Sequence, residues 1–299
     1  MKSDPHALSG VAVGLLWMLG NTCFGLAAPE PKVSVTVALE HDTIFRGESI
    51  QLTLKILNEG KEPVWVLHPS VALQTLGIDF ELEGAKTGRV RRTLKPSPPV
   101  APKPADFVEL AAGESLTHAC DLTVVTSLRP SQADSYTLTA LVRVDQHLLR
   151  SPAVALTVVE VPPLKGLQRS TLERSAQAGK YWVRADVGLA PAAKDQLWLL
   201  VVLSRTNAGE DPQTFHKQRV LRLTTLTPQT KLQSGIVGGS GIEQPADLHV
   251  LLTDLKNAQC YWVIAVNGSQ VTRTENFKEA KVRMSQPDAQ GGVTVIIER

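Results

Sequence analysis

The sequence predicts an all-β protein, with an N-terminal β-sandwich followed by a second β domain. Short apolar runs alternate with polar residues at a period of two, as at Val33, Val35 and Val37, which is the pattern of a half-buried strand. Turn-forming segments such as Asn58-Glu59-Gly60-Lys61 separate these runs, as in antiparallel sheets. The 299 residues, 43% hydrophobic and 20% charged, are enough for two globular domains.

Residues 1–27 have the three-part pattern of a secretory signal peptide. Lys2 precedes an apolar run at 11–19, and Gly25 and Ala27 supply small residues before the expected cleavage point. The run is about half as long as a membrane-spanning helix, which needs about 20 apolar residues. We therefore expect an extracytoplasmic protein, either periplasmic, in the cell envelope or secreted. Cleavage of this segment, its retention as an anchor and a lipidated form all stay open.

Residues 28–161 form the predicted sandwich. Its expected strands are 33–39, 50–56, 64–67, 78–82, 107–110, 116–125, 136–144 and 154–159. Trp65 lies on the third of these, where a large ring would fill the space between two sheets. Cys120 alternates with apolar residues, so we expect it on an inward face. Whether it is bridged to Cys260 or stays a thiol is left open.

Three segments of this domain resemble a known family: Gly47-Glu48-Ser49-Ile50, Leu110-x-x-Gly113-Glu114-Ser115 and Tyr136-x-Leu138-x-Ala140. With them, residues 32–160 are similar to bacterial immunoglobulin-like domains, including those of the intracellular proteinase inhibitor type. The resemblance implies a sandwich of two antiparallel sheets. Leu138 stands where antibody-type domains carry a cysteine, so the disulfide of that subfamily is absent. Inhibitor activity would be an analogy from fold alone.

A basic, proline-rich insertion interrupts the sandwich at residues 84–105. Insertions of this length without a core of their own are often functional, and the prolines favour an extended backbone. It is either a solvated hairpin extension or a docking loop for an anionic partner. The candidate binding residues in it are Arg89, Arg91, Arg92 and Lys95.

We expect a linker at residues 162–179 and the second β domain at residues 180–299. Strand patterns occur at 181–187, 196–203, 219–225, 248–253, 261–266, 270–274, 281–284 and 293–297. The segment 248–299 resembles a blade of a β-propeller. A closed propeller of four or more blades needs more residues than this domain has. The domain is therefore either another sandwich or an open, propeller-like fragment.

The sequence offers no pattern of catalytic or metal-binding residues. Its histidines are scattered without the spacing of metal ligands. The glycine-rich stretch 235–241 lacks the Lys and Ser/Thr of a phosphate loop, so we expect a surface loop there. We therefore predict a protein that is not an enzyme and uses no catalytic residue, metal or cofactor.

Aromatic pairs at 181–182 and 261–262 stand out in the second domain. Neighbouring strand residues point to opposite faces, so one member of each pair belongs in the core. Trp262 shares a face with Ile264, which leaves Tyr181 and Tyr261 as the exposed members. Rings on a β surface can stack on sugars or anchor a protein interface. Tyr181, Tyr261 and Trp262 are thus candidate binding residues, with core packing as the alternative.

These patterns predict an extracytoplasmic, non-catalytic binding or protein-interaction module. Its partner would be a protein of the cell envelope or extracellular space. The alternatives are a carbohydrate-binding accessory protein, with a glycan as ligand, and a proteinase-inhibitor-like protein. A net charge of +2 gives no argument for nucleic acid as a partner. Contact with a membrane is expected only through an uncleaved signal segment.

Overall fold

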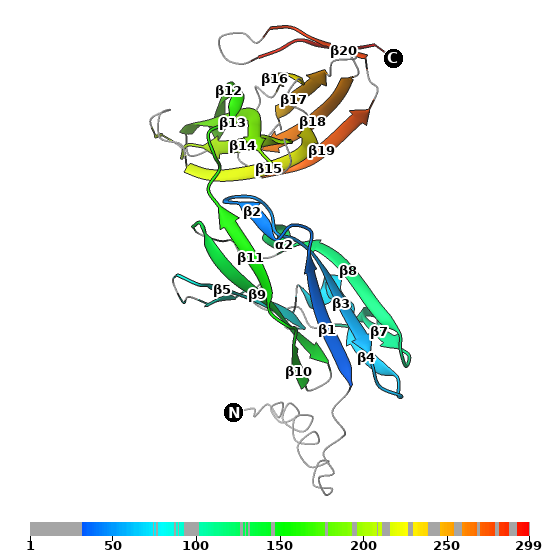
Figure 1. Cartoon of the computed structure of the whole chain (residues 1–299). Helices are drawn as coiled ribbons and strands as arrows, with labels where there is room; N and C mark the ends of the chain where they lie inside the picture. The colour runs from blue at the N-terminus through cyan, green and yellow to red at the C-terminus, as the bar shows by residue number, and fades with distance from the viewer. Residues whose placement is uncertain are drawn as a thin grey trace, which may run out of the picture.

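The computed structural model in Figure 1 describes residues 32–298, except 74, 76, 87, 89, 93–101, 126–127, 129, 131, 145–146, 177–178, 193–195, 208, 211–215, 227–229, 239–245, 254–258, 268–269, 279–280 and 287–291. The expected signal segment at 1–27 lies outside these residues. The described chain is almost entirely strands arranged in several sheets, which confirms the all-β fold class with more than one β domain. Among these residues, no helix is long and apolar enough to cross a membrane.

The N-terminal part is built from two main sheets that share one apolar core. One has the order β1-β3-β8, with β1 Val33–Leu39, β3 Gln51–Asn58 and β8 Ser115–Asp121. The other has the order β2-β11-β9-β5-β6, with β2 Thr43–Phe45, β11 Val154–Val159, β9 Asp134–Val144, β5 Ile78–Gly84 and β6 Val90–Arg92, and β10 His147–Arg150 also pairs with β9. Leu52, Leu54 and Ile56 of β3 enter the core at every second position, as their alternation predicts.

A separate two-stranded sheet is formed by β4 (Val64–Leu67) and β7 (Phe107–Leu110). It continues from β3 and β8 beyond a corner that the buried Asn58 holds. The Asn58 Nδ2 donates hydrogen bonds to the carbonyl oxygens of Glu62 at 2.8 Å and Leu110 at 2.9 Å. The connections nearby contain the short turns α1 (Pro69–Ala72) and η1 (Pro104–Asp106).

Two expectations about these strands were wrong. Trp65 does not lie between the sheets, because Val64 and Val66 occupy the inward positions of β4 and leave the ring 52% exposed. The strand expected at 116–125 ends at Asp121, whose carboxylate accepts a hydrogen bond from the Thr123 backbone N–H at 2.9 Å. The chain then enters a helical turn, α2 (Leu122–Val125).

The C-terminal part has two four-stranded antiparallel sheets (Figure 1). The first is β12 Lys165–Ala176, β13 Gly179–Pro191, β14 Leu197–Arg205 and β15 His216–Leu226, and the second is β16 Lys231–Val237, β17 Ala246–Thr253, β18 Gln259–Asn267 and β19 Gln270–Lys278. Buried residues of both sheets form one core. It includes Leu199, Val201 and Leu203 at alternate positions of β14, and Trp262 of β18.

The expected linker at 162–179 is wrong for most of its length, because residues 165–176 form β12. The polar residues there belong to an edge strand with one exposed face, so its sequence lacks a strong apolar alternation. The side chain of Gln168 joins β12 to β16: its Nε2 donates to the Leu232 carbonyl oxygen at 2.6 Å, and its Oε1 accepts from the Ser234 N–H. β16 likewise includes residues 235–237, which the sequence placed in a surface loop.

A C-terminal hairpin adds a third layer. Its strands β20 (Lys281–Met284) and β21 (Val295–Glu298) pair with each other, and its residue Val282 packs against Tyr261 and Val263 on the outer face of β18. The Val282 N–H donates to Gln259 Oε1 at 2.7 Å, which fixes the start of the hairpin against β18. The outer face of this sheet is therefore partly covered.

Candidate functional site

The most exposed aromatic side chain of the described residues, Trp65, lies on the β4–β7 sheet. Trp65 is paired with Glu109, and Phe107 is its diagonal neighbour on the adjacent strand, so all three side chains share the outward face. Trp65 is 52% and Phe107 is 39% exposed. We call these three residues the aromatic surface. Phe107 is two residues beyond the end of the basic insertion, so this surface lies where the insertion rejoins the sandwich.

The structure describes little of the basic insertion itself. Arg91 and Arg92 lie on β6, where they are paired with Leu82 and Glu81 of β5. Arg89 and Lys95 lie outside the described residues. The structure therefore gives the start of a hairpin at β5–β6 and leaves the predicted binding role of these four residues a prediction.

The aromatic residues of the second domain do not form an exposed platform. Tyr261 is fully buried, so its predicted exposure is wrong, and the reason is the β20–β21 hairpin that covers its face. Trp262 is buried in the core on the opposite face of β18, as its alternation with Ile264 predicts. Tyr181 is half-buried and packs against the same core.

Tyr261 instead belongs to a buried polar pair. Its hydroxyl is hydrogen-bonded to Nδ1 of His249, and the two rings are stacked with their centroids 5.7 Å apart. Burial raises the pKa of Tyr261 to about 12, with a further contribution from Asp247. Burial lowers the pKa of His249, and Asp247 opposes that shift. Both rings are thus neutral near pH 7, which suits packing rather than proton transfer.

A buried guanidinium joins the two domains. Arg222 of β15 donates to Glu48 Oε2 at 2.8 Å and to the Thr43 carbonyl oxygen at 3.0 Å. Its guanidinium carbon lies 4.5 Å from the ring centroid of Trp198 and 5.1 Å from that of Phe45. Charge pairing and two aromatic faces therefore hold this cation at the junction.

Further contacts fix the same junction. The Val220 N–H donates to the Gly47 carbonyl oxygen at 3.0 Å, and Arg219 donates to Ser49 Oγ at 2.8 Å. Arg219 also lies 3.6 Å from Asp121. Because these contacts run from β15 to the turn after β2 and to the end of β8, the two domains meet in a defined orientation.

A cleft of about 290 Å³ opens beside this junction. It is lined by Arg46 from the N-terminal domain, Glu160 and Leu164 from the connecting segment, and Leu167 and Asp186 from the first strands of the second domain. Arg46 Nε lies 3.0 Å from Glu160 Oε2. The exposed lining of the cleft is mainly polar, with charged groups of both signs and a smaller contribution from Leu164 and Leu167.

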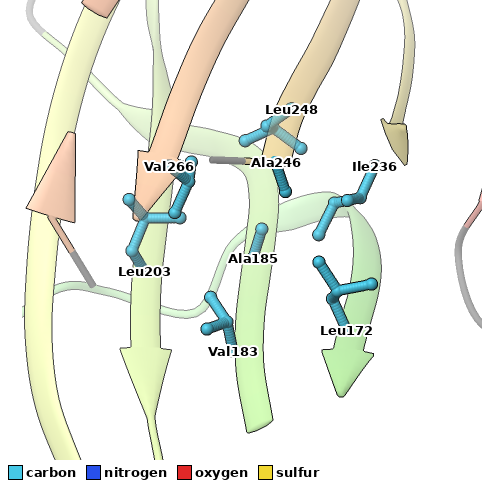
Figure 2. A pocket seen from close by; sticks show the side chains of 8 residues that line it. All are labelled: Leu172, Val183, Ala185, Leu203, Ile236, Ala246, Leu248 and Val266. Carbon is cyan, nitrogen blue, oxygen red and sulfur yellow. The ribbon is translucent and has the colours of Figure 1, made fainter. Parts of the chain in front are cut away.

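A second, apolar cavity lies between the sheets of the C-terminal domain. Figure 2 shows aliphatic side chains from both sheets pointing into it, among them Leu172, Ala185, Leu203, Ala246 and Leu248. Its free space is about 10 Å³, which is close to the size that holds one water molecule. We regard it as a packing void and not as a ligand site.

The described residues show no group of three or more His, Cys, Asp or Glu side chains that could hold a metal ion. Cys120 and Cys260 are separate thiols rather than a disulfide. Burial, with the nearby Asp121, raises the pKa of Cys120 to about 11, so its thiol is protonated near neutral pH and is a poor nucleophile. The half-buried position of Cys120 agrees with its expected inward face.

Sequence reasoning missed Trp65 and Phe107 as surface residues and Arg222 as a junction residue. The alternation of side chains along β4 could have shown the exposure of Trp65. Val64 and Val66, on either side of it, are apolar and point to one face, so the ring of Trp65 points to the other face. Arg222 carried no such signal, since its partner Glu48 is 174 positions away in the sequence.

No protein-family model matches the chain, and no curated protein matches it significantly. Among solved structures, the chain is similar to the Pseudomonas fluorescens alkylpurine DNA glycosylase AlkC bound to DNA containing an abasic site analog, with 13% identity and a TM-score of 0.26. That match covers 44% of this chain and 31% of the glycosylase chain, so the match spans about a third of that protein's length. The chain is also similar to the sporulation control protein Spo0M of Bacillus subtilis, with 12% identity, a TM-score of 0.27, and coverage of 57% and 79%. Neither similarity is high enough to support a functional argument.

Proposed function

We propose that this protein is a non-catalytic binding module that works outside the cytoplasm and recognises a protein partner of the cell envelope or extracellular space. The observation that carries the proposal is the aromatic surface of Trp65, Phe107 and Glu109. Large aromatic side chains are enriched among the residues that dominate protein interfaces. Exposed apolar groups that cluster on a folded protein often mark such an interface.

The position of this surface supports the same proposal. It begins two residues after the end of the basic insertion at 84–105, and Lys103 of that insertion precedes Phe107 by four positions. A partner with an acidic rim around an apolar centre fits this combination, because complementary charge speeds association and aromatic burial slows dissociation. The signal-like pattern at 1–27 supports the extracytoplasmic location.

We also propose that the N-terminal domain is immunoglobulin-like. The sheet order β1-β3-β8 corresponds to strands A, B and E of that fold, and β11-β9-β5-β6 corresponds to G, F, C and C′. Loops at the ends of such sandwiches commonly carry binding function. The assignment supports a binding role without naming a partner.

A capture experiment tests the proposed function. The full chain is immobilised, exposed to envelope and secreted extract of the native cell, and compared with the Trp65→Ala/Phe107→Ala double variant. Leu148→Ala is the matched control, because Leu148 is a similarly exposed apolar residue on β10. We expect a partner that the wild type and the control retain and the double variant loses. Equal retention by all three proteins would remove the aromatic surface from the proposal.

Carbohydrate binding is a second candidate, and we propose the aromatic surface as its site in place of the second-domain rings, of which Tyr261 and Trp262 are buried. The Glu109 carboxylate lies opposite Trp65, so a sugar stacked on the ring would have a hydrogen-bond acceptor beside it. Titration with a glycan panel, followed by tryptophan fluorescence, tests this candidate. A response that Trp65→Ala abolishes would favour a glycan, whereas no response to any glycan would leave the protein partner as the proposal.

A further inference from the structure

The cleft at the domain junction has the location and rigidity of a ligand site. Small-molecule sites are commonly preformed clefts at domain interfaces. Arg222, Arg219 and Val220 hold the two domains together on one side of it, so its walls keep their positions. Its volume of about 290 Å³ suits a small molecule.

One ion pair in the cleft could be replaced by ion pairs with a ligand. Arg46 and Glu160 face each other at 3.0 Å, and their side chains are 43% and 59% exposed. Exposed ion pairs contribute little net stability, so a ligand that offers both opposite charges can replace each partner at small cost. A ligand with only one charge can pair with only one of these residues, so it makes one ion pair fewer with the cleft.

The remaining charge in the cleft is already neutralised. Asp186 is nearly buried, and its two carboxylate oxygens face Arg169 Nε at 2.7 Å and Arg184 Nε at 3.3 Å. The bond to Asp186 also raises the pKa of Arg169. Asp186 is therefore a fixed part of the wall, and Arg46 and Glu160 are the charged groups that can turn toward a ligand.

A smaller apolar part of the lining adds to the recognition. Leu164 and Leu167 line the cleft together with Pro162, and Leu167 is 45% exposed in this structure. Covering an exposed leucine with an apolar group is favourable because it removes apolar surface from water.

We propose that the cleft binds a zwitterionic ligand with an apolar side chain, of the class of free α-amino acids such as leucine. Its carboxylate would pair with Arg46, its ammonium group with Glu160, and its side chain would cover Leu167. This inference is independent of the aromatic surface, which lies on the β4–β7 sheet.

Isothermal titration calorimetry of the full chain tests the proposal with four compounds: L-leucine, leucine amide, N-acetyl-leucine and glycine. Leucine amide lacks the carboxylate, N-acetyl-leucine lacks the ammonium group, and glycine lacks the side chain. We expect leucine to bind, leucine amide and N-acetyl-leucine to bind at least about tenfold more weakly, and glycine to bind more weakly by a smaller factor, because little apolar surface lines the cleft. No binding of leucine at about 10 mM, or equal binding of leucine and leucine amide, would overturn the proposal.

Three variants locate the site. Arg46→Gln and Glu160→Gln should each weaken leucine binding at least about tenfold. Glu173→Gln is the matched control, because Glu173 forms an exposed ion pair with Lys180 elsewhere in the second domain. Leucine binding that survives in both cleft variants would place the ligand elsewhere and contradict the assignment. Circular dichroism of each variant confirms that the exposed substitutions leave the fold intact.

Discussion

Arg222 illustrates how one residue can determine the relation between two domains. Arg222 and Glu48 are only 9% and 8% exposed, so both charges have lost most of their hydration. A buried pair of this kind is not necessarily stabilising compared with apolar residues. Removing one partner alone is costly, because the other charge then stays buried without compensation.

We expect Arg222→Ala to lower the free energy of unfolding by about 3–5 kcal/mol, since Glu48 would be left in the junction without its counter-ion. Urea denaturation followed by circular dichroism measures the change. Lys180→Ala is the control, because its ion pair with Glu173 is exposed and should contribute less than about 1 kcal/mol. Similar small losses in both variants would show that the buried pair does not hold the junction.

The buried pair of His249 and Tyr261 predicts that the free energy of unfolding falls at both acid and alkaline pH. The folded chain lowers the pKa of His249, so the unfolded chain binds more protons and stability falls as the pH drops below about 6.5. The folded chain raises the pKa of Tyr261 from 10.0 to about 12, so the unfolded chain loses its proton first and stability falls as the pH rises from about 10 to 12.

Urea denaturation across pH measures both losses. Tyr261→Phe should remove the alkaline loss that belongs to this residue, and His249→Gln should reduce the acid loss. Some acid loss should remain in His249→Gln, because burial and the nearby His68 also lower the pKa of His118. An unchanged acid loss in His249→Gln would contradict the assignment.

At the scale of elements, alternation in the sequence located most strands, because one face of each packs on a core. β3 is the clearest case, since Leu52, Leu54 and Ile56 fill every second position. β12 was missed because it is an edge strand with many polar residues, and the hairpin β20–β21 was not foreseen as a cover. This hairpin covers the outer face of β18, and the alternation of residues within β18 gives no sign of that cover. This is why Trp262 was placed correctly and Tyr261 was not.

The packing of the two C-terminal sheets predicts a loss of stability when a buried side chain between them is shortened. Leu248 of β17 is fully buried beside the small void shown in Figure 2. Leu248→Ala would enlarge this void, so we expect a loss of about 2–5 kcal/mol in the free energy of unfolding. Leu148→Ala removes the same atoms from an exposed site and should cost far less. Equal losses would mean that the sheets do not depend on this contact.

In the whole molecule, we expect the junction contacts to make the two domains one cooperative unit. We expect a single transition in differential scanning calorimetry of the wild type, because Phe45 and Val220 belong to one apolar cluster that spans both domains. Arg222→Ala should separate this into two transitions. Two transitions already present in the wild type would show that the domains unfold independently.

The sequence alone could not supply this arrangement. The contact between Glu48 and Val220 joins residues far apart along the chain, and neither has a local pattern that points to the other. The exposure of Trp65 could have been predicted from the sequence, because alternation along β4 places Trp65 on the other face of the strand from the valines on either side of it. The cleft could not be predicted from the sequence, because Arg46 and Asp186 come together only when the two domains pack against each other.

The dissociation constant of the captured partner shows whether the aromatic surface binds a protein. The purified partner is titrated against the wild type, Trp65→Ala, Phe107→Ala and the Leu148→Ala control. We expect Trp65→Ala to weaken binding by roughly 30-fold or more, which corresponds to the loss of about 2 kcal/mol typical of a dominant interface residue. The control should bind like the wild type. Unchanged affinity in both aromatic variants would show that this surface does not bind the partner.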